Sequence, residues 1–183
     1  LERIRDIRAT EKVLYRQVLE IYATSIDYDP RASVSQEFFK KVQNKIHYAI
    51  HGHTAAELIV ERADAEKDFM GLLTFKGNQP TLSEARTAKN YLDEKELRAM
   101  GQLVSGYLDF AERQAEREQP MTMNDWANYL DRILTMSGEQ LLLDSGKVSH
   151  TEAMEHATNE YRKYKQRTIS DVEQDYLDSI KRI

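Results

Sequence analysis

The segment IHGHTAAELIVERAD, residues 50–64, contains the end of one helical pattern and the start of another. Gly52 stands where the first helix needs a left-handed C-terminal cap, a conformation that glycine adopts without a steric penalty. Thr54 and Glu57 fit the capping box, in which each side chain accepts the other residue's backbone amide. The segment therefore predicts two helices joined by a tight turn, with the second running to about Asp64.

The same pattern of a capping residue followed three positions later by an acidic residue recurs along the chain. The capping positions are Thr81, Asp93, Thr122 and Ser149. Each of them predicts a helix start. Ahead of the central segment, a helix is predicted from Ser35 because apolar residues from Phe39 to Ile50 fall on one helical face. The fold class that follows is all-α, a multi-helix bundle.

Long amphipathic helices are predicted at both ends of the chain. The first 26 residues carry an apolar residue at steps of three or four, ending before Pro30. The last 35 residues carry the same pattern and, if continuous, would form a helix about 50 Å long. We expect a helical domain over residues 1–148, and a long C-terminal helix over residues 149–183 that packs on it or dimerises.

One segment interrupts the helical patterns. Phe69–Phe75 is short, apolar and rich in β-forming residues, and Lys76–Pro80 is rich in turn-forming residues. The segment predicts a small β-hairpin near residues 69–81, as the single ordered part that is not helical.

Composition restricts the possible functions. The chain has 183 residues, 26 basic against 31 acidic, and a formal charge of -5, which disfavours broad binding of phosphate backbones. Cysteine is absent, and no apolar run approaches the ~20 residues that span a bilayer. We therefore expect a cytoplasmic protein without membrane contact. The chain begins at Leu1 inside a helical pattern, which suggests a missing N-terminal domain.

The central turn contains residue types that bind metals, but their spacing is unfavourable. His51 and His53 are two positions apart and do not share a helix face, whereas a zinc-binding helix needs histidines four apart. His47 is four residues before His51, but Lys45 beside it would repel a cation. We expect no metal and no cofactor, and read the histidines as part of a solvated turn.

The helix, turn and helix could instead form a DNA-reading element. The second helix, residues 55–64, carries Glu57, Glu61 and Asp64 against Arg62 alone, so it would be repelled by the DNA backbone. Ordinary packing of two helices explains the segment equally well. No GxSxG elbow or P-loop spacing is present, and no residue is singled out as a catalytic nucleophile.

Several polar residues embedded in helix-forming stretches could line one pocket. This candidate polar pocket comprises Asn44, His53, Glu57, Arg62, Asp64, Lys89 and Asn90. The alternative for each of them is solvent exposure with local hydrogen bonding.

The central motif resembles that of the RhuM family of bacterial virulence-associated proteins. The matching pieces are VQNK (42–45), YA (48–49), GHTAAELI (52–59) and RAD (62–64). Further matches in order and spacing are AKNYL (88–92), LDFAE (108–112), QAE (114–116), PMTM (120–123) and DW (125–126). The resemblance covers all but about the last thirty residues.

The resemblance implies a DNA-binding region N-terminal to this chain and an origin in pathogenicity islands or other mobile elements. It implies no defined activity. Some relatives carry the label Fic or death-on-curing protein, and Fic chemistry requires a His followed by a Gly-Asn-x-Arg anion nest. Residues 53–62, HTAAELIVER, contain no Gly or Asn, so Fic-type chemistry is disfavoured.

Two hypotheses follow. The first is a non-enzymatic helical interaction domain that forms a homo-oligomer through its amphipathic terminal helices and spaces two DNA-binding domains. The second is a toxin-like enzyme that uses the candidate polar pocket. Convergence of the seven pocket residues in one cleft would favour the enzyme.

Overall fold

A computed structural model describes residues 16, 20, 22–31, 33–168 and 171–182 of the chain. The α-helices are α2 (Ser33–His51), α3 (Ala55–Arg62), α4 (Leu82–Ala85), α5 (Glu94–Glu116), α6 (Met123–Met136), α7 (His150–Arg167) and α8 (Asp171–Lys181). Two 3-10 turns, η1 (Asp68–Gly71) and η2 (Ala88–Tyr91), lie between them. The all-α prediction is confirmed. The predicted first helix falls largely outside the described residues.

The helix starts predicted from capping residues are confirmed. Thr54, Thr81, Asp93 and Thr122 each form a complete capping box at the start of α3, α4, α5 and α6. Ser149 caps α7 by accepting the amide of the third helical residue. A cap of this kind contributes about 1 kcal/mol, so five of them fix where the chain turns.

The turn between α2 and α3 has the predicted form. Gly52 has a φ of 77°, and its amide donates to the Tyr48 carbonyl at 2.9 Å. Because only glycine adopts this conformation readily, Gly52 ends α2 and lets Thr54 start α3 two residues later.

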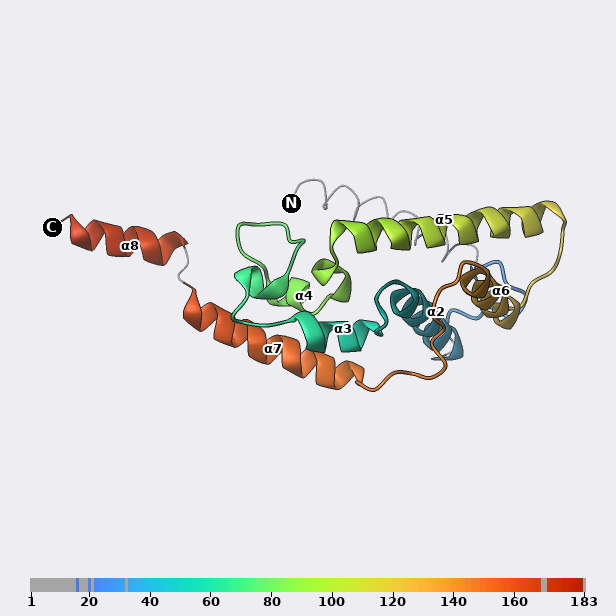
Figure 1. Ribbon diagram of the computed structural model, residues 1–183, viewed down its shortest axis with the longest axis horizontal. Coiled ribbons are helices and arrows are strands. Elements are labelled where there is room, and N and C mark those ends of the chain that lie inside the picture. Colours follow the sequence, from blue (N-terminus) through green and yellow to red (C-terminus); the bar gives the residue numbers. More distant parts are fainter. Residues whose placement is uncertain (1–15, 17–19, 21, 32, 169–170, 183) are drawn as a thin grey trace.

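The central part of the molecule is a sandwich of helices. Figure 1 shows α5 along one side and α7 along the other, with α3 and α4 between them. Leu58 of α3, Leu97 of α5 and Ala153 of α7 are completely buried there. Burying a side chain such as Leu58 contributes about 1.5–3 kcal/mol. At one end α2 packs against α5 and α6, which completes the core.

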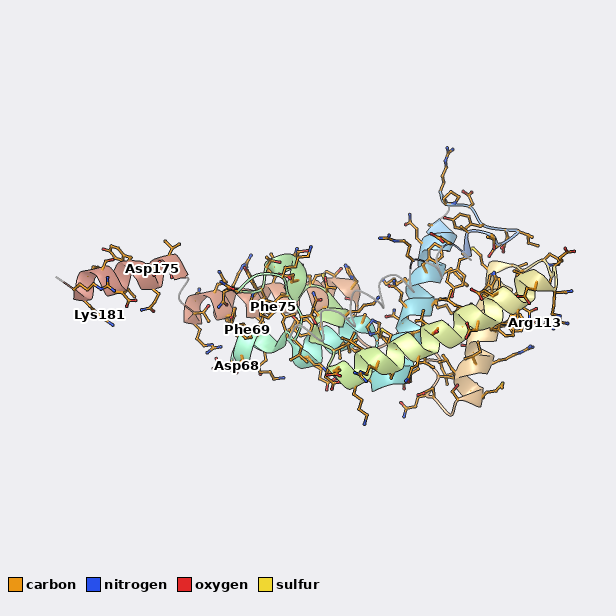
Figure 2. The ribbon with its side chains drawn as sticks, turned by 90° about the horizontal axis from the view of Figure 1, so that it is seen from above. Asp68, Phe69, Phe75, Arg113, Asp175 and Lys181 are labelled. Carbon is orange, nitrogen blue, oxygen red and sulfur yellow. The ribbon has the colours of Figure 1, made fainter. Side chains whose placement is uncertain are left out.

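The predicted β-hairpin at residues 69–81 is wrong, since no strand occurs in the described part of the chain. Phe69 and Met70 adopt left-handed conformations within η1, and the Leu73 and Thr74 amides both donate to the Asn90 carbonyl. The run buries Met70 in the core, and Figure 2 shows Phe69 beside Phe75, with ring centroids 4.9 Å apart. Packing against η2 therefore replaces strand pairing.

The C-terminal segment forms two helices rather than one continuous helix. Thr168 caps α7 in an extended conformation, with ψ at 146°, so the helical path ends there. α7 packs through Ala153, Ala157 and Tyr164 against α3, α4 and η1, whereas every described side chain of α8 is exposed. The division at residues 148 and 149 stays a prediction. None of the described helices has the length and apolar character needed to cross a membrane.

Candidate functional site

A large groove opens between α2, the start of α3, the loop at residues 142–149 and the first turn of α7. Its volume is about 1310 Å³. Apolar side chains, including Ile59, Leu142 and Met154, line its inner part, and the lysines Lys40 and Lys147 belong to its walls. The groove thus combines apolar area with basic side chains.

The central turn anchors the loop that forms one wall of the groove. The Glu57 carboxylate accepts the Thr54 amide at 2.9 Å and the Lys147 amide at 3.1 Å. Burial alone would raise the pKa of Glu57, but these hydrogen bonds and that from the Thr54 hydroxyl keep the pKa below its ordinary value. Glu57 is therefore an anionic acceptor that holds the loop on α3.

Close packing of the loop on the turn requires a glycine at position 146. Gly146 has a φ of 86°, and a Cβ atom there would lie 2.6 Å from the Thr54 Cγ2 atom. The Gly146 amide donates to the Asp144 carboxylate at 2.8 Å, which shapes the loop locally. The opposite wall is joined to the turn as well, because the Asn44 side chain accepts the Ala55 amide at 3.2 Å.

A partly buried ion pair belongs to the lining of the groove. The Lys45 ammonium contacts the Asp131 carboxylate at 2.6 Å, and Lys45 is almost fully buried. The pair joins α2 to α6, and its two charges neutralise each other within the groove.

Arg62 connects the end of α3 to the start of α5. Its guanidinium donates to both carboxylate oxygens of Glu96 at 2.7 Å and to the Tyr91 carbonyl at 3.1 Å. The hydrogen bonds with Glu96 raise the pKa of Arg62. Burial raises the pKa of Glu96, but the bonds from Arg62 and the Asp93 amide outweigh burial and lower it. Both groups stay ionised as a two-point brace.

Two other polar residues of the central segment make local contacts. The His53 Nε2 atom lies 2.7 Å from the Glu61 carboxylate at the surface. Asp64 accepts the Glu66 amide at 3.0 Å, which forms a short turn after α3.

The two candidates in η2 support the segment that precedes them. The Asn90 side chain donates to the Glu84 carbonyl at 3.0 Å, at the end of α4. Lys89 is half-buried beside it.

The family model of the Virulence protein RhuM family matches residues 1–172. The chain belongs to this family. The resemblance inferred from the central motif is thereby confirmed, and the match extends farther toward the C-terminus than the motifs did. No curated protein and no solved structure matches the chain.

The RhuM-family motif therefore consists largely of structural contacts. Of the seven residues of the candidate polar pocket, Asn44 lines the groove, and the other six lie outside its lining. Asn44 and Glu57 hold the turn, Arg62 braces two helices, and Asp64 and Asn90 stabilise turns. His53 contacts Glu61 on the outer side of α3.

Three of the five histidines of this RhuM-family chain, His47, His51 and His53, form a row at the end of α2. The His47 Nδ1 and His51 Nε2 atoms are 2.9 Å apart, and the rings of His51 and His53 stack with centroids 6.1 Å apart. Burial lowers the pKa of His51 to about 4, against the opposing effect of the Glu96 carboxylate. Among the described residues, no three His, Cys, Asp or Glu side chains are arranged to hold a metal.

Sequence reasoning missed the groove. Its walls come from Lys40 and Lys41 on α2 and from the loop at residues 142–149, of which only Ser149, as a helix cap, belongs to a recognisable motif. The signal that could have identified the loop is the run LLLDSGKV, residues 141–148, where an apolar stretch meets turn-forming residues without helical spacing.

Proposed function

We propose that this RhuM-family chain is a non-enzymatic interaction domain that self-associates through α8. The observation that carries the proposal is an apolar stripe on α8. Val172 is 78% exposed and Tyr176 is 65% exposed, and Leu177 and Ile180 are exposed as well. Val172, Tyr176 and Ile180 are four residues apart and share one helix face.

The length of α8 strengthens the argument. α8 has 11 residues, and isolated helices shorter than about 12–15 residues are marginally stable in water. A short helix that leaves its apolar stripe in solvent gains its stability from a partner. Self-association would bury the stripe and stabilise α8 at the same time.

A second copy of the chain is the partner that the structure supports best. Apolar side chains are also exposed at the other end of the molecule, where Leu143 is 92% exposed in the loop that forms the groove. Figure 1 shows this loop at the α6 side and α8 beyond the far end of α7. One chain thus carries two separate unburied apolar surfaces, as protomers of homo-oligomers do.

The contacts of the candidate polar pocket support a non-enzymatic role. An active site needs groups that converge on one reacting atom, with side chains available to the substrate. Here Glu57 accepts two backbone amides, and Arg62 is engaged by Glu96 and Tyr91. The toxin-like enzyme stays the alternative.

The DNA-binding part of the proposal rests on the family resemblance, which implies a DNA-binding region N-terminal to this chain. Self-association of this chain would bring two such regions together at a fixed spacing, which is how dimeric proteins read paired half-sites. The formal charge of -5 on this chain agrees with a spacing role rather than a direct DNA contact.

Sedimentation equilibrium of the chain between about 1 and 100 µM tests the proposal. We expect the wild-type chain to associate over this range, and the variant Val172→Ser/Tyr176→Ser/Ile180→Ser to remain a monomer. Met136→Ser, which removes an equally exposed apolar side chain at the end of α6, is the control and should associate like the wild type. A wild-type chain that is monomeric at the highest concentration refutes the proposal.

A further inference from the structure

We infer that the groove between α2 and the loop at residues 142–149 binds α8 of a second copy of this chain. This inference rests on the self-association proposed above and names the surface that receives α8. It is argued from charge, from size and from the reach of the chain.

The charges of the two surfaces are complementary. α8 carries four acidic residues and one basic residue between Asp171 and Lys181. The groove is lined by five basic and four acidic side chains, a net of one positive charge in a chain whose formal charge is -5. Lys40 and Lys41 are both exposed on α2, and Lys147 is exposed on the loop. An acidic helix is therefore attracted to the groove more strongly than to most of the surface.

The first turn of α7 adds to this attraction. Ser149 and His150, at the N-terminal end of α7, both line the groove. The helix dipole is positive at this end, because the first amides of the helix point outward there. The pair of Asp131 and Lys45 removes one charge of each sign from this balance, and Asp144 accepts the Gly146 amide.

The groove also has the size and polarity that an amphipathic helix needs. An 11-residue helix is about 16 Å long and about 10 Å wide, which is larger than a small-molecule ligand. The groove measures about 1310 Å³, whereas small-molecule sites enclose about 300–1,000 Å³. Its apolar lining includes Leu142, Val148 and the exposed Leu143, and would cover the stripe at Val172 and Tyr176.

The groove that receives α8 belongs to another copy, because the connection after α7 is too short for the whole of α8 to lie in the groove of its own chain. α7 has 18 residues and is about 27 Å long, and the groove lies at its first turn. The connection from Arg167 to Asp171 spans at most about 14 Å. If α8 folded back along α7, it would begin at most about 14 Å from the C-terminal end of α7, so only about its last half could reach the first turn of α7. Figures 1 and 2 both show α8 beyond the C-terminal end of α7.

Two chains can exchange their α8 helices around a twofold axis. If the α7 helices of two copies run antiparallel, the C-terminal end of each points toward the first turn of the other. Each α8 then enters the partner's groove, and both exposed apolar surfaces are buried in one closed dimer. Direct pairing of α8 with α8 is the competing arrangement, and it leaves the groove unfilled.

A mixing experiment with two complementary variants separates these arrangements. The first is the α8 variant Val172→Ser/Tyr176→Ser/Ile180→Ser, and the second is the groove variant Lys40→Glu/Lys41→Glu. We expect each variant alone to dimerise at least about tenfold more weakly than the wild type. In an equimolar mixture, the intact α8 of one variant meets the intact groove of the other. Sedimentation should therefore detect a mixed dimer that neither variant forms with itself.

The controls distinguish an effect on the interface from an effect of misfolding or of the change in net charge. Lys95→Glu/Arg98→Glu changes the charge by the same amount on exposed positions of α5 outside the groove, and should dimerise like the wild type. Adding Asp175→Lys/Asp178→Lys to the groove variant reverses the charges of α8 as well as those of the groove. The resulting variant should recover most of its dimerisation. Thermal melting by circular dichroism checks that each variant is folded.

The possible outcomes distinguish the inference from the proposed function. A groove variant that dimerises like the wild type, together with an α8 variant that does not, refutes docking in the groove and leaves self-association through α8 intact. Absence of a mixed dimer also refutes docking in the groove. A wild-type chain that never dimerises refutes both.

Discussion

The central turn and α8 differ in how far their side chains are engaged by the rest of the fold. The turn, residues 52–57, contains two histidines and a glutamate, the residue types of active sites, yet Glu57 and Thr54 hold the backbone of the turn and its neighbouring loop. α8 contains no histidine, and its apolar side chains are left in solvent. The polar groups of the turn are thus engaged by contacts within the fold, whereas the apolar stripe of α8, which the sequence predicts to pack or to dimerise, is exposed.

The largest loss of stability is expected from a substitution at Gly71, which packs against the end of the central segment. A Cβ atom there would lie 2.3 Å from the Arg62 carbonyl oxygen, and the φ of 93° is unfavourable for any other residue. Because the obstacle is backbone, we expect Gly71→Ala to lower the free energy of unfolding by about 3–5 kcal/mol. Urea denaturation measures this decrease in the free energy of unfolding. Gly101→Ala, where no atom lies within 4 Å, is the control and should be neutral or stabilising.

Removal of the brace at Arg62 should have the next largest effect. Arg62→Ala leaves the partly buried Glu96 carboxylate and the Tyr91 carbonyl without this donor, at a cost of about 2–3 kcal/mol. Arg98→Ala breaks an exposed pair with Glu94 at 2.9 Å and should cost under ~0.5 kcal/mol. Equal losses in urea denaturation would contradict the role of Arg62 as a brace.

A smaller effect is expected from pH. The pKa of His51 is about 4 in the folded chain and about 6.5 when unfolded, so the unfolded chain binds more protons between these values. The stability contributed by neutral His51 is complete above pH 6.5 and is lost as the pH falls toward 4. After allowance for solvent screening, the loss is about 1–2 kcal/mol. The neighbouring groups that act on His51 are Glu57, Arg62, His53, Glu96 and His47.

Denaturation at pH 7 and pH 5 measures this dependence. His51→Gln should reduce the loss of stability between the two pH values, and the exposed His150→Gln should leave it unchanged. An unchanged loss in the His51 variant would show that burial of this imidazole is not its cause.

The smallest effect on stability is expected at α8, which completes the comparison. In dilute solution, where the chain is monomeric, Val172→Ser and Tyr176→Ser should each change the free energy of unfolding by less than ~0.5 kcal/mol, because neither side chain is buried. At concentrations where the wild type associates, the same substitutions should lower its melting temperature. A large destabilisation of the monomer would mean that α8 packs on its own chain.

Local signals in the sequence were sufficient for the helices and insufficient for the groove. Helix starts depend on residues three positions apart, so Thr54, Asp93 and Thr122 could be recognised from sequence. The apolar run after Phe69 was misassigned because its burial depends on η2, which follows it along the chain. The role of Arg62 was hidden for the same reason, since Glu96 is 34 positions away.

The hydrogen bond between Glu57 and the Lys147 amide joins residues 90 positions apart. Closing so long a loop costs conformational entropy before any contact compensates for it, and contacts of this kind slow folding. We therefore expect the wall at residues 142–149 to be set in place late, after α3 and α5 have packed. A newly made chain would then hold an incomplete receptor for its partner until its last third has been synthesised and docked.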